Sequence, residues 1–275
     1  MEFVDVSNVR IPALGFGTWQ ITGAACRSAV AAALEIGYRH IDTAQMYENE
    51  AEVGLALSQS GIQREKLWVT TKLARLKPEK VLSSTRESLR RLNTDYLDLL
   101  LIHWPDPEIP LSETLGAMQE LVKRGEVRHI GVSNFTPKLV AEALAQAPII
   151  CNQVECHPFL NQAALRQIAV QSHTALVAYA PLARGKVGRD QTLLDIGRAH
   201  DKSPHQVALR WLLDKKNVVA IPKAQLREHA EANFGIFDLQ LTAEETRRID
   251  GLNRSERLID PSWAPNWGER PRVEA

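Results

Sequence analysis

Eight short apolar runs, rich in β-branched and aromatic residues, most strongly constrain the fold of this chain. They cover residues 14–17, 38–41, 67–71, 96–102, 128–132, 149–154, 175–180 and 217–221. Each gap between them is long enough for a helix, and regular alternation of strand and helix is typical of parallel strands joined by helical crossovers. Eight such units in 275 residues fit a closed barrel better than an open doubly wound sheet. The predicted fold class is α/β, a (β/α)8 TIM barrel.

The gaps carry helical signals. Apolar residues of the stretch 81–92 recur on one face at a period of 3.6, which predicts an amphipathic helix. Hydroxyl N-caps, two of them before a proline and two opening a capping box, mark further helix starts at Thr136-Pro137, Ser203-Pro204 with Gln206, and Thr242 with Glu245.

We expect a single domain over residues 1–275, because no linker or low-complexity stretch interrupts the series. Residues 1–13 precede the first barrel strand and are predicted to cover the bottom of the barrel. The tail, residues 261–275, is too rich in proline for a helix and is predicted to lie over one barrel face.

Charge and composition narrow the function classes. The formal net charge is +0, which removes the long-range attraction that nucleic-acid or anionic-membrane binders use. No apolar stretch approaches membrane-spanning length and no signal-peptide pattern opens the chain. The cysteines Cys26, Cys151 and Cys156 lack paired spacing, so neither a disulfide framework nor a zinc site is predicted. We expect a cytoplasmic protein without nucleic-acid or membrane partners.

Polar side chains follow every predicted strand. In this architecture chemistry sits at the carboxyl ends of the strands. One such residue could simply face solvent, but eight strand ends together point to a site, and two tryptophans among them suit a pocket for a flat ligand. The set comprises Thr18-Trp19-Gln20, Asp42, Lys72, His103-Trp104, Ser133-Asn134, Gln153 with Glu155, Tyr179, and Pro222-Lys223.

Asp42, Tyr47 and Lys72 suit a proton-donor assembly. A phenol with its ordinary pKa of ~10 is a reluctant acid, and a neighbouring ammonium brings that pKa toward neutrality. A buried lysine keeps its charge when a carboxylate such as Asp42 holds it. These residues alone also allow a purely structural interpretation, in which Asp42 and Lys72 form an ion pair and Tyr47 is a packed side chain. His103 ends the following strand, where an imidazole can hydrogen-bond a substrate oxygen.

These residues also carry a family resemblance. The pattern runs through Gly15-Phe16-Gly17-Thr18-Trp19, His40-Ile41-Asp42-Thr43-Ala44 with Tyr47, Thr70-Thr71-Lys72, Leu101-Ile102-His103-Trp104-Pro105, Ile130-Gly131-Val132-Ser133-Asn134-Phe135, Asn152-Gln153-Val154-Glu155-Cys156-His157-Pro158, Tyr179-Ala180-Pro181-Leu182 and Ile221-Pro222-Lys223. In this order the motifs resemble those of the aldo-keto reductases. Within that family the chain is similar to the bacterial 2,5-diketo-D-gluconate reductase B group, also known for methylglyoxal reduction.

The resemblance implies an NAD(P)H-dependent carbonyl reductase. It makes Tyr47 the proton donor, Lys72 the group that lowers its pKa, Asp42 the group that holds Lys72, and His103 the group that orients the carbonyl. Trp19 and Trp104 would wall the substrate pocket beside Tyr47 and His103. No metal is required by this chemistry.

The resemblance also implies a dinucleotide site across the barrel mouth. Ser133, Asn134 and Gln153 would bind the carboxamide, Tyr179 would stack on the nicotinamide, and the stretch from Leu182 would cross the pyrophosphate. The other residues assigned to the cofactor are Thr18, Trp19, Asp42, Lys223, Arg227, His229 and Asn233.

Departures from the family pattern lie in the segment after Lys223. Members that prefer NADPH usually have serine, arginine and glutamate where this chain has Ala224, His229 and Ala232. Lys223 and Asn233 are kept, and Arg227 lies close enough to offer another cation, but the bidentate phosphate clamp of an arginine is weakened. We expect NADPH to be preferred and NADH to be tolerated.

The connection over residues 104–111 and the tail are short by the standards of that family, which predicts an open, shallow site for small aldehydes, keto-sugars or dicarbonyls. We also expect the protein to be a monomer. Two other functions stay open on the sequence. One is a barrel lyase in which Lys72 forms a Schiff base. The other is a non-catalytic cofactor-sensing subunit that keeps the fold.

Overall fold

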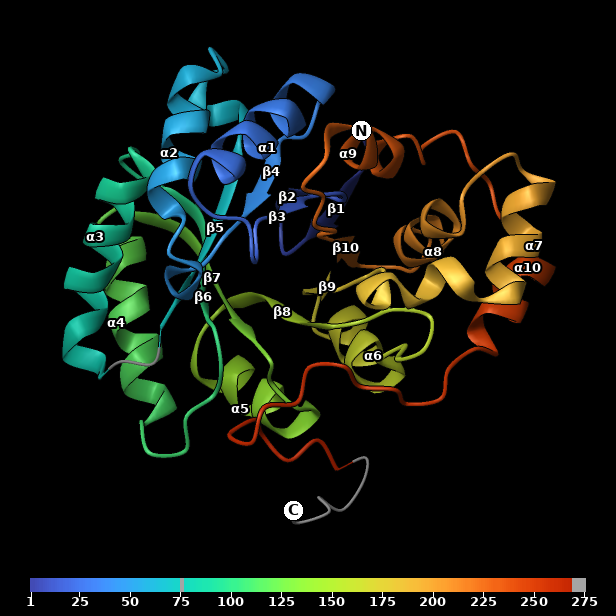
Figure 1. Cartoon of the computed structure of the whole chain (residues 1–275). Helices are drawn as coiled ribbons and strands as arrows, with labels where there is room; N and C mark the ends of the chain where they lie inside the picture. Colours follow the sequence, from blue (N-terminus) through green and yellow to red (C-terminus); the bar gives the residue numbers. More distant parts are fainter. Residues whose placement is uncertain (75–76, 269–275) are drawn as a thin grey trace.

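The computed structural model describes residues 1–74 and 77–268, and in it eight parallel strands form one sheet with helices outside (Figure 1). The sheet order is β10-β9-β8-β7-β6-β5-β4-β3, and parallel bridges join Leu14 to Ala220 and Gly17 to Lys223 across its two edges. The sheet is therefore closed, as the predicted (β/α)8 barrel requires. The sheet strands are β3 (Phe16–Gly17), β4 (His40–Asp42), β5 (Trp68–Leu73), β6 (Leu97–Ile102), β7 (Val127–Ser133), β8 (Ile149–Glu155), β9 (Ala175–Tyr179) and β10 (Val218–Ala220).

Helices surround this sheet in chain order. They are α1 (Gly23–Ile36), α2 (Glu50–Gln59), α3 (Val81–Leu92), α4 (Leu111–Lys123), α5 (Pro137–Gln146), α6 (Ala163–Gln171), α7 (Gln191–Ala199), α8 (Pro204–Leu213), α9 (Arg227–Phe234) and α10 (Ala243–Asp250). Short 3-10 helices lie at η1 (Gln45–Tyr47), η2 (Arg64–Lys66), η3 (Pro78–Lys80) and η4 (Ala183–Arg189). None of the helices in the described ranges is long and apolar enough to cross a membrane.

The predicted helix starts coincide with real ones. The side chains of Thr136, Ser203 and Thr242 each accept a hydrogen bond from the third residue of α5, α8 and α10. The last two form complete capping boxes with Gln206 and Glu245. Local capping chemistry therefore fixes where these helices begin.

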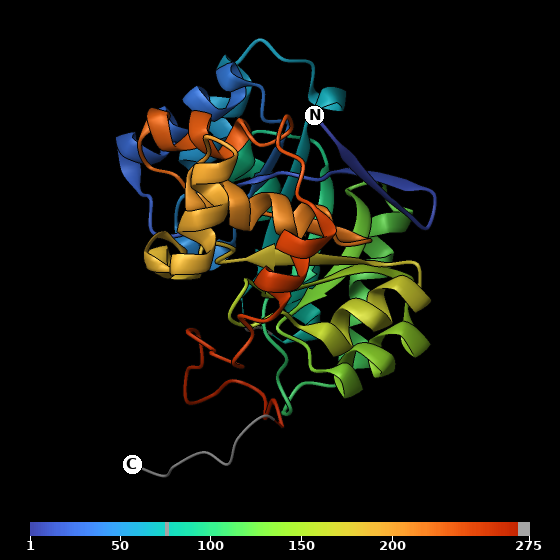
Figure 2. The same cartoon turned by 90° about the vertical axis from the view of Figure 1, so that its right-hand side faces the viewer.

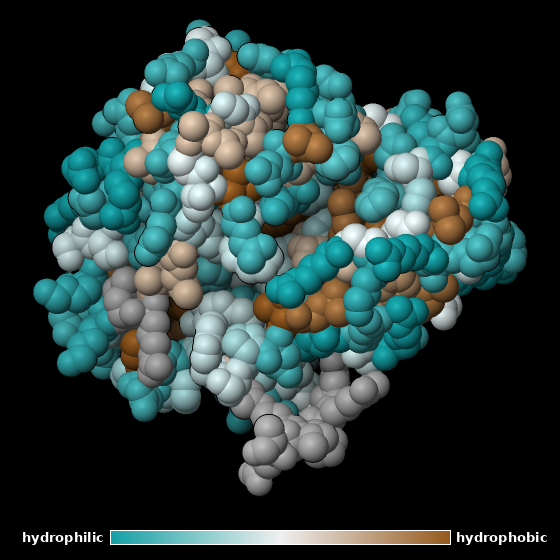
Figure 3. Space-filling view, in the orientation of Figure 1, coloured by the Kyte–Doolittle hydropathy of each residue, from teal (hydrophilic) through white to brown (hydrophobic). Residues whose placement is uncertain are grey.

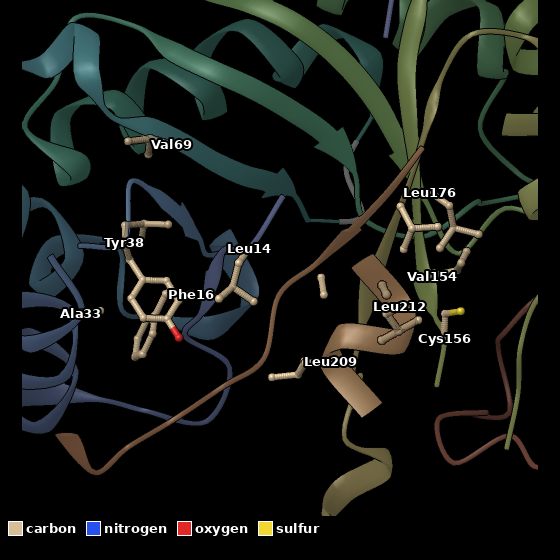
Figure 4. Close-up of a cluster of buried hydrophobic side chains, with 14 of the residues drawn as sticks. Leu14, Phe16, Ala33, Tyr38, Val69, Val154, Cys156, Leu176, Leu209 and Leu212 are labelled. Carbon is tan, nitrogen blue, oxygen red and sulfur yellow. The ribbon is translucent and has the colours of Figure 1, made fainter. Parts of the chain in front are cut away.

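Two hydrophobic layers fill the space inside and outside the sheet. On β9, Val177 belongs to the cluster inside the barrel, whereas Leu176 packs outward against helices. Figure 4 shows the outer layer, in which Phe16 and Tyr38 lie together and Leu176 lies near Leu212 of α8. This alternation follows from the two-residue period of a strand.

The first 13 residues, for which the sequence predicts a cover over the barrel bottom but no strands, form an antiparallel hairpin of β1 (Phe3–Val6) and β2 (Val9–Pro12). Ser7 and Asn8 take left-handed conformations at its turn, as a two-residue hairpin of this hand requires. Val6 and Ile11 are buried in the inner cluster, and the Ser7 hydroxyl donates to the carbonyl of His173, just before β9. The hairpin therefore packs on the amino-terminal end of the barrel.

The chain after α10 runs back across the molecule as an irregular segment, drawn in red in Figures 1 and 2. Of the predicted tail, residues 261–268 contain no helix and residues 269–275 lie outside the described residues.

Candidate functional site

The polar strand ends meet at the carboxyl-terminal mouth of the barrel. Asp42 ends β4, Lys72 lies near the end of β5, and His103 follows β6. Tyr47 ends the short helix η1, which lies between β4 and α2. In the orientation of Figure 1, the surface is hollowed near the centre of the barrel, with apolar residues deep in the hollow and hydrophilic ones around it (Figure 3).

Lys72 is fully buried and its ammonium is surrounded by oxygen atoms. It donates to the Asp42 carboxylate at 2.5 Å, to the carbonyl of Thr43 at 2.9 Å and to the Tyr47 hydroxyl at 3.3 Å. Burial, the largest single influence, lowers the pKa of Lys72, but the charges and hydrogen bonds of Asp42 and Tyr47 together outweigh it, so the pKa lies above its ordinary value. Lys72 is therefore a charged donor with three partners.

Asp42 is held on its other side as well. Its second carboxylate oxygen accepts a hydrogen bond from the Gln153 amide at 2.8 Å, and its side chain is almost completely buried. Because both oxygens have partners, the desolvation of this carboxylate is offset by an ion pair and a hydrogen bond.

Tyr47 carries a neutral phenol in this structure. Burial raises its pKa, the Lys72 charge lowers it, and the net pKa lies above its ordinary value. This corrects the expected shift toward neutrality: Lys72 acts in the expected direction, but desolvation of the phenolate is larger. Since the ammonium donates to the phenol oxygen, the phenolic hydrogen is left to be given to another acceptor.

The His103 ring lies beside Tyr47, with ring centroids 5.7 Å apart in an edge-on arrangement. Burial, and to a lesser extent the Lys72 charge, lowers the pKa of His103 to about 3. Its Nδ1 atom is buried and has no hydrogen-bond partner within residues 1–74 and 77–268. The imidazole is therefore neutral and has one N–H to donate.

Four of the predicted cofactor residues form one hydrogen-bond network beside this group. The Tyr179 hydroxyl donates to the Asn134 side chain at 2.7 Å, and Asn134 donates to Ser133 at 3.1 Å and to the carbonyl of His103 at 2.9 Å. The Ser133 hydroxyl donates to the Gln153 carbonyl at 2.9 Å. Amide and hydroxyl groups at the ends of β7 and β8, next to a half-buried aromatic ring on β9, suit a carboxamide-bearing flat ring.

The predicted residues of the first strand end differ in exposure. Thr18 is fully buried and its hydroxyl donates to the carbonyl of Asp42 at 3.0 Å, so its hydrogen is already used inside the protein. Trp19 is 40% exposed, and the Arg184 guanidinium of η4 lies over its ring. Trp104 packs edge-on against Trp263 of the tail, at 4.8 Å between centroids.

The predicted phosphate-binding residues lie at the surface around α9. Lys223, Arg227 and His229 are exposed, whereas Asn233 is buried. Arg227 is paired with Glu35 of α1 at 2.6 Å and Glu231 at 2.9 Å, so it is less available as an extra cation than its position suggested. Leu182 immediately precedes η4, and its carbonyl accepts from Gly185.

Three residues next to Tyr47 support the site without having been assigned a role. Asn49 is fully buried, accepts from Thr43 and donates to the carbonyls of Thr18 and Ile21. Gln45 and Glu50 connect the same loop to α3 and β5. In the sequence, polar residues at a loop–helix junction are expected to face solvent. Only the fold shows that these three side chains are buried or partly buried and connect the loop to its neighbours.

Comparison with known proteins shows which family this chain belongs to. The model of the Aldo/keto reductase family matches residues 13–254. The methylglyoxal reductase DkgB of Escherichia coli O157:H7 is 41% identical over 265 residues, which cover 94% of this chain and 99% of that protein. The 9,11-endoperoxide prostaglandin H2 reductase of Trypanosoma cruzi is 40% identical over 260 residues, 92% of this chain and 91% of that protein.

Solved structures agree with the sequence comparison. A crystal structure of a protein assigned as 2,5-diketo-D-gluconic acid reductase B superposes with a TM-score of 0.95 at 42% identity, covering 97% of both chains. The aldose reductase of Schistosoma japonicum superposes with a TM-score of 0.91 at 34% identity, covering 96% of both chains. The chain belongs to the aldo/keto reductase family and is an NAD(P)H-dependent oxidoreductase that reduces carbonyl groups.

Proposed function

We propose that this enzyme prefers NADPH and reduces small aldehydes, keto-sugars or dicarbonyls of the 2,5-diketo-D-gluconate or methylglyoxal type, with Tyr47 as the proton donor. The observation that carries the mechanism is the hydrogen bond from the Lys72 ammonium to the Tyr47 oxygen, which leaves the phenolic hydrogen free to be given away. The names of the similar reductases support the substrate class.

The bound dinucleotide supplies the hydride that adds to the carbonyl carbon. Tyr47 gives its proton to the carbonyl oxygen, so the developing alkoxide is neutralised as it forms. Lys72 stabilises the phenolate that remains, and Asp42, braced by Gln153, keeps Lys72 charged and in place. Neutral His103 donates a hydrogen bond that orients the carbonyl oxygen.

The test of this mechanism is the Tyr47→Phe variant, which keeps the ring and removes only the hydroxyl. Methylglyoxal reduction should fall by about 10²- to 10⁴-fold, the usual contribution of a general acid, while the affinity for NADPH is retained. Cofactor binding is measured by quenching of tryptophan fluorescence. Reduction at the wild-type rate would exclude Tyr47 as the donor.

We assign the cofactor contacts by the network at the mouth. Ser133, Asn134 and Gln153 would bind the carboxamide, Tyr179 would stack on the nicotinamide, and the segment from Leu182 through η4 would cover the pyrophosphate. Thr18 supports this site through Asp42, and Trp19 stands at its rim. Asn233, a buried residue of α9, is also assigned to the cofactor site.

NADPH preference rests on the exposed groups at α9. Lys223 supplies a cation, and the first turn of α9 has no side-chain cap, so its N–H groups are open to an anion. His229 replaces the expected arginine, and Arg227 must leave two carboxylates to help. Initial rates at matched concentrations of NADPH and NADH test this, and faster turnover with NADH would overturn the preference.

The surroundings of Lys72 count against a Schiff-base lyase. A Schiff base needs a neutral amine with a free lone pair, whereas Lys72 has a raised pKa and three oxygen partners. Borohydride should therefore trap no substrate adduct on Lys72. The complete group of Asp42, Tyr47, Lys72 and His103 likewise favours catalysis over a purely cofactor-sensing subunit.

We further propose that the enzyme acts as a monomer in the cytoplasm. The three cysteines are buried as free thiols, which suits a reducing compartment. Light scattering of the purified protein and fractionation of its host cells test these two points, and a stable dimer or an exported pool would contradict them.

A further inference from the structure

Glu155, the last residue of β8, has a fully buried carboxylate outside the catalytic group. One of its oxygens accepts the backbone N–H of Leu258 at 2.8 Å, and the other accepts that of Ile259 at 3.0 Å. The His157 ring lies 2.9 Å from the first oxygen. A carboxylate this deeply buried is costly unless its oxygens are hydrogen-bonded, and here both bind the chain that follows α10.

The chain approaching this carboxylate lies beside the loop after β8. The Phe159 carbonyl accepts the N–H groups of Arg254 and Glu256 at 3.2 and 3.0 Å, and the Asn253 side chain accepts the N–H of Asn161 at 3.1 Å. Residues 253–259 are therefore attached to the barrel at several successive points. Glu155 makes the last of these attachments, and the only buried charged one within the described part of this segment.

Four residues beyond Ile259, the tail reaches the catalytic mouth. Trp263 is 54% exposed and packs edge-on against Trp104, which directly follows His103 in the chain. The Trp267 indole donates to Asp260, which fixes the turn that carries Trp263. Trp263 therefore contacts the residue that directly follows His103 in the chain.

We propose that Glu155 is a positioning residue: it holds residues 258 and 259, and so places the tail that follows, in which Trp263 forms an aromatic wall with Trp104. This wall strengthens the binding of carbonyls large enough to reach it. This inference rests on the proposed reduction at Tyr47 and adds to it the residue that sets substrate size discrimination. A small substrate is held by Tyr47 and His103 alone, so its turnover does not depend on Glu155.

The variant Glu155→Gln tests the proposal, because it keeps the side-chain shape but turns an NH₂ group toward the backbone N–H of Leu258 or Ile259. The substrates are 2,3-butanedione and 1-phenyl-1,2-propanedione, which differ by phenyl in place of methyl. The KM of the phenyl compound should rise roughly five- to tenfold, the factor one aromatic contact supplies. Its kcat, and both constants for 2,3-butanedione, should stay within about twofold of the wild type.

A double variant separates action through the tail from general damage. In the Trp263→Ala background the wall is already lost, so adding Glu155→Gln should leave the KM ratio of the two diones unchanged. Ile259→Pro removes one of the two backbone N–H groups that Glu155 binds and leaves β8 unaltered. It should therefore raise the KM of the phenyl compound in the same way, even if Glu155→Gln does not fold. Glu113→Gln, an exposed glutamate on α4, is the matched control.

Limited trypsin cleavage gives a readout that needs no catalysis. Cleavage after Arg254 and Arg257 should accelerate in Glu155→Gln and Ile259→Pro, but not in Glu113→Gln. If Glu155→Gln changed neither the KM ratio of the two diones nor the cleavage rate, the role of Glu155 would be wrong. It would also be wrong if Glu155→Gln shifted the KM ratio equally in the wild-type and Trp263→Ala backgrounds. Wild-type enzyme that reduces neither dione would instead contradict the proposed function, and the cleavage rates would still report on the tail.

Discussion

At the scale of single residues, the site depends on charges that are buried together. Lys72 and Asp42 are each nearly inaccessible to solvent, and each would be strongly destabilising alone. The fold therefore maintains them as a pair. The same burial keeps the protons on Tyr47 and off His103.

Replacing Asp42 by Asn should leave the Lys72 ammonium buried without its counter-charge. We expect the free energy of unfolding to fall by about 3 kcal/mol, measured by urea denaturation, and carbonyl reduction to fall with it. Asp238→Asn breaks a comparable pair with Lys202 at the surface, where the aspartate is 73% exposed, and should leave the urea midpoint unchanged. Equal effects of the two changes would contradict a special cost of the buried pair.

His103 should make the protein less stable in acid. Its pKa is about 3 in the folded state and 6.5 ordinarily, so between these values the unfolded chain binds the proton and the folded chain does not. The penalty is close to zero at pH 8.0 and grows as the pH falls through 6.5, reaching about 1.4 kcal/mol at pH 5.5. Urea midpoints at pH 8.0 and 5.5 should therefore diverge less in His103→Gln than in the wild type. A parallel decline would show that His103 titrates alike in both states.

At the scale of elements, local sequence determines where helices begin, but it does not determine which helices pack against each other. The capping boxes at Ser203 and Thr242 are written in four consecutive residues. In contrast, Gly54 of α2 approaches α3 so closely that a Cβ would lie 2.4 Å from the carbonyl of Arg91. Nothing in the local sequence of α2 predicts this contact with α3.

Loss of one cap should cost a predictable amount. Ser203→Ala removes the acceptor for the Gln206 N–H and should lower the free energy of unfolding by about 1 kcal/mol, measured by thermal or urea denaturation. Ser58→Ala, at an exposed position inside α2, should cause no loss because alanine suits a helix interior. A cost at position 58 equal to that at 203 would argue against the capping interpretation.

At the scale of the whole molecule, the two ends of the barrel have different tasks. The proposed catalytic group and the tail lie at the carboxyl ends of the strands, and the β1–β2 hairpin packs on the opposite end. Changes at the hairpin should therefore affect stability and leave the chemistry intact.

Ile11→Ala tests this division. Ile11 is completely buried in the inner cluster, so the change should cost about 2–5 kcal/mol of unfolding free energy while kcat for methylglyoxal stays at the wild-type value. Phe3→Ala, in the same hairpin but 41% exposed, is the control and should cost about 1 kcal/mol or less. A loss of kcat in a folded Ile11→Ala enzyme would show that the two ends are coupled.

The sequence by itself determined the barrel, the positions of its eight strands and several helix starts, because these follow from local periodicity and capping. It also singled out Asp42, Tyr47, Lys72 and His103, since polar residues at strand ends converge in any parallel barrel. Only the tertiary structure decided which forces dominate there: desolvation outweighs Lys72 at Tyr47, and Arg227 is paired with Glu35 and Glu231. The hairpin of residues 3–12 and the attachment of Leu258 and Ile259 to Glu155 likewise follow from the fold. Burial and long-range pairing depend on segments far apart in the chain, and local sequence does not specify them.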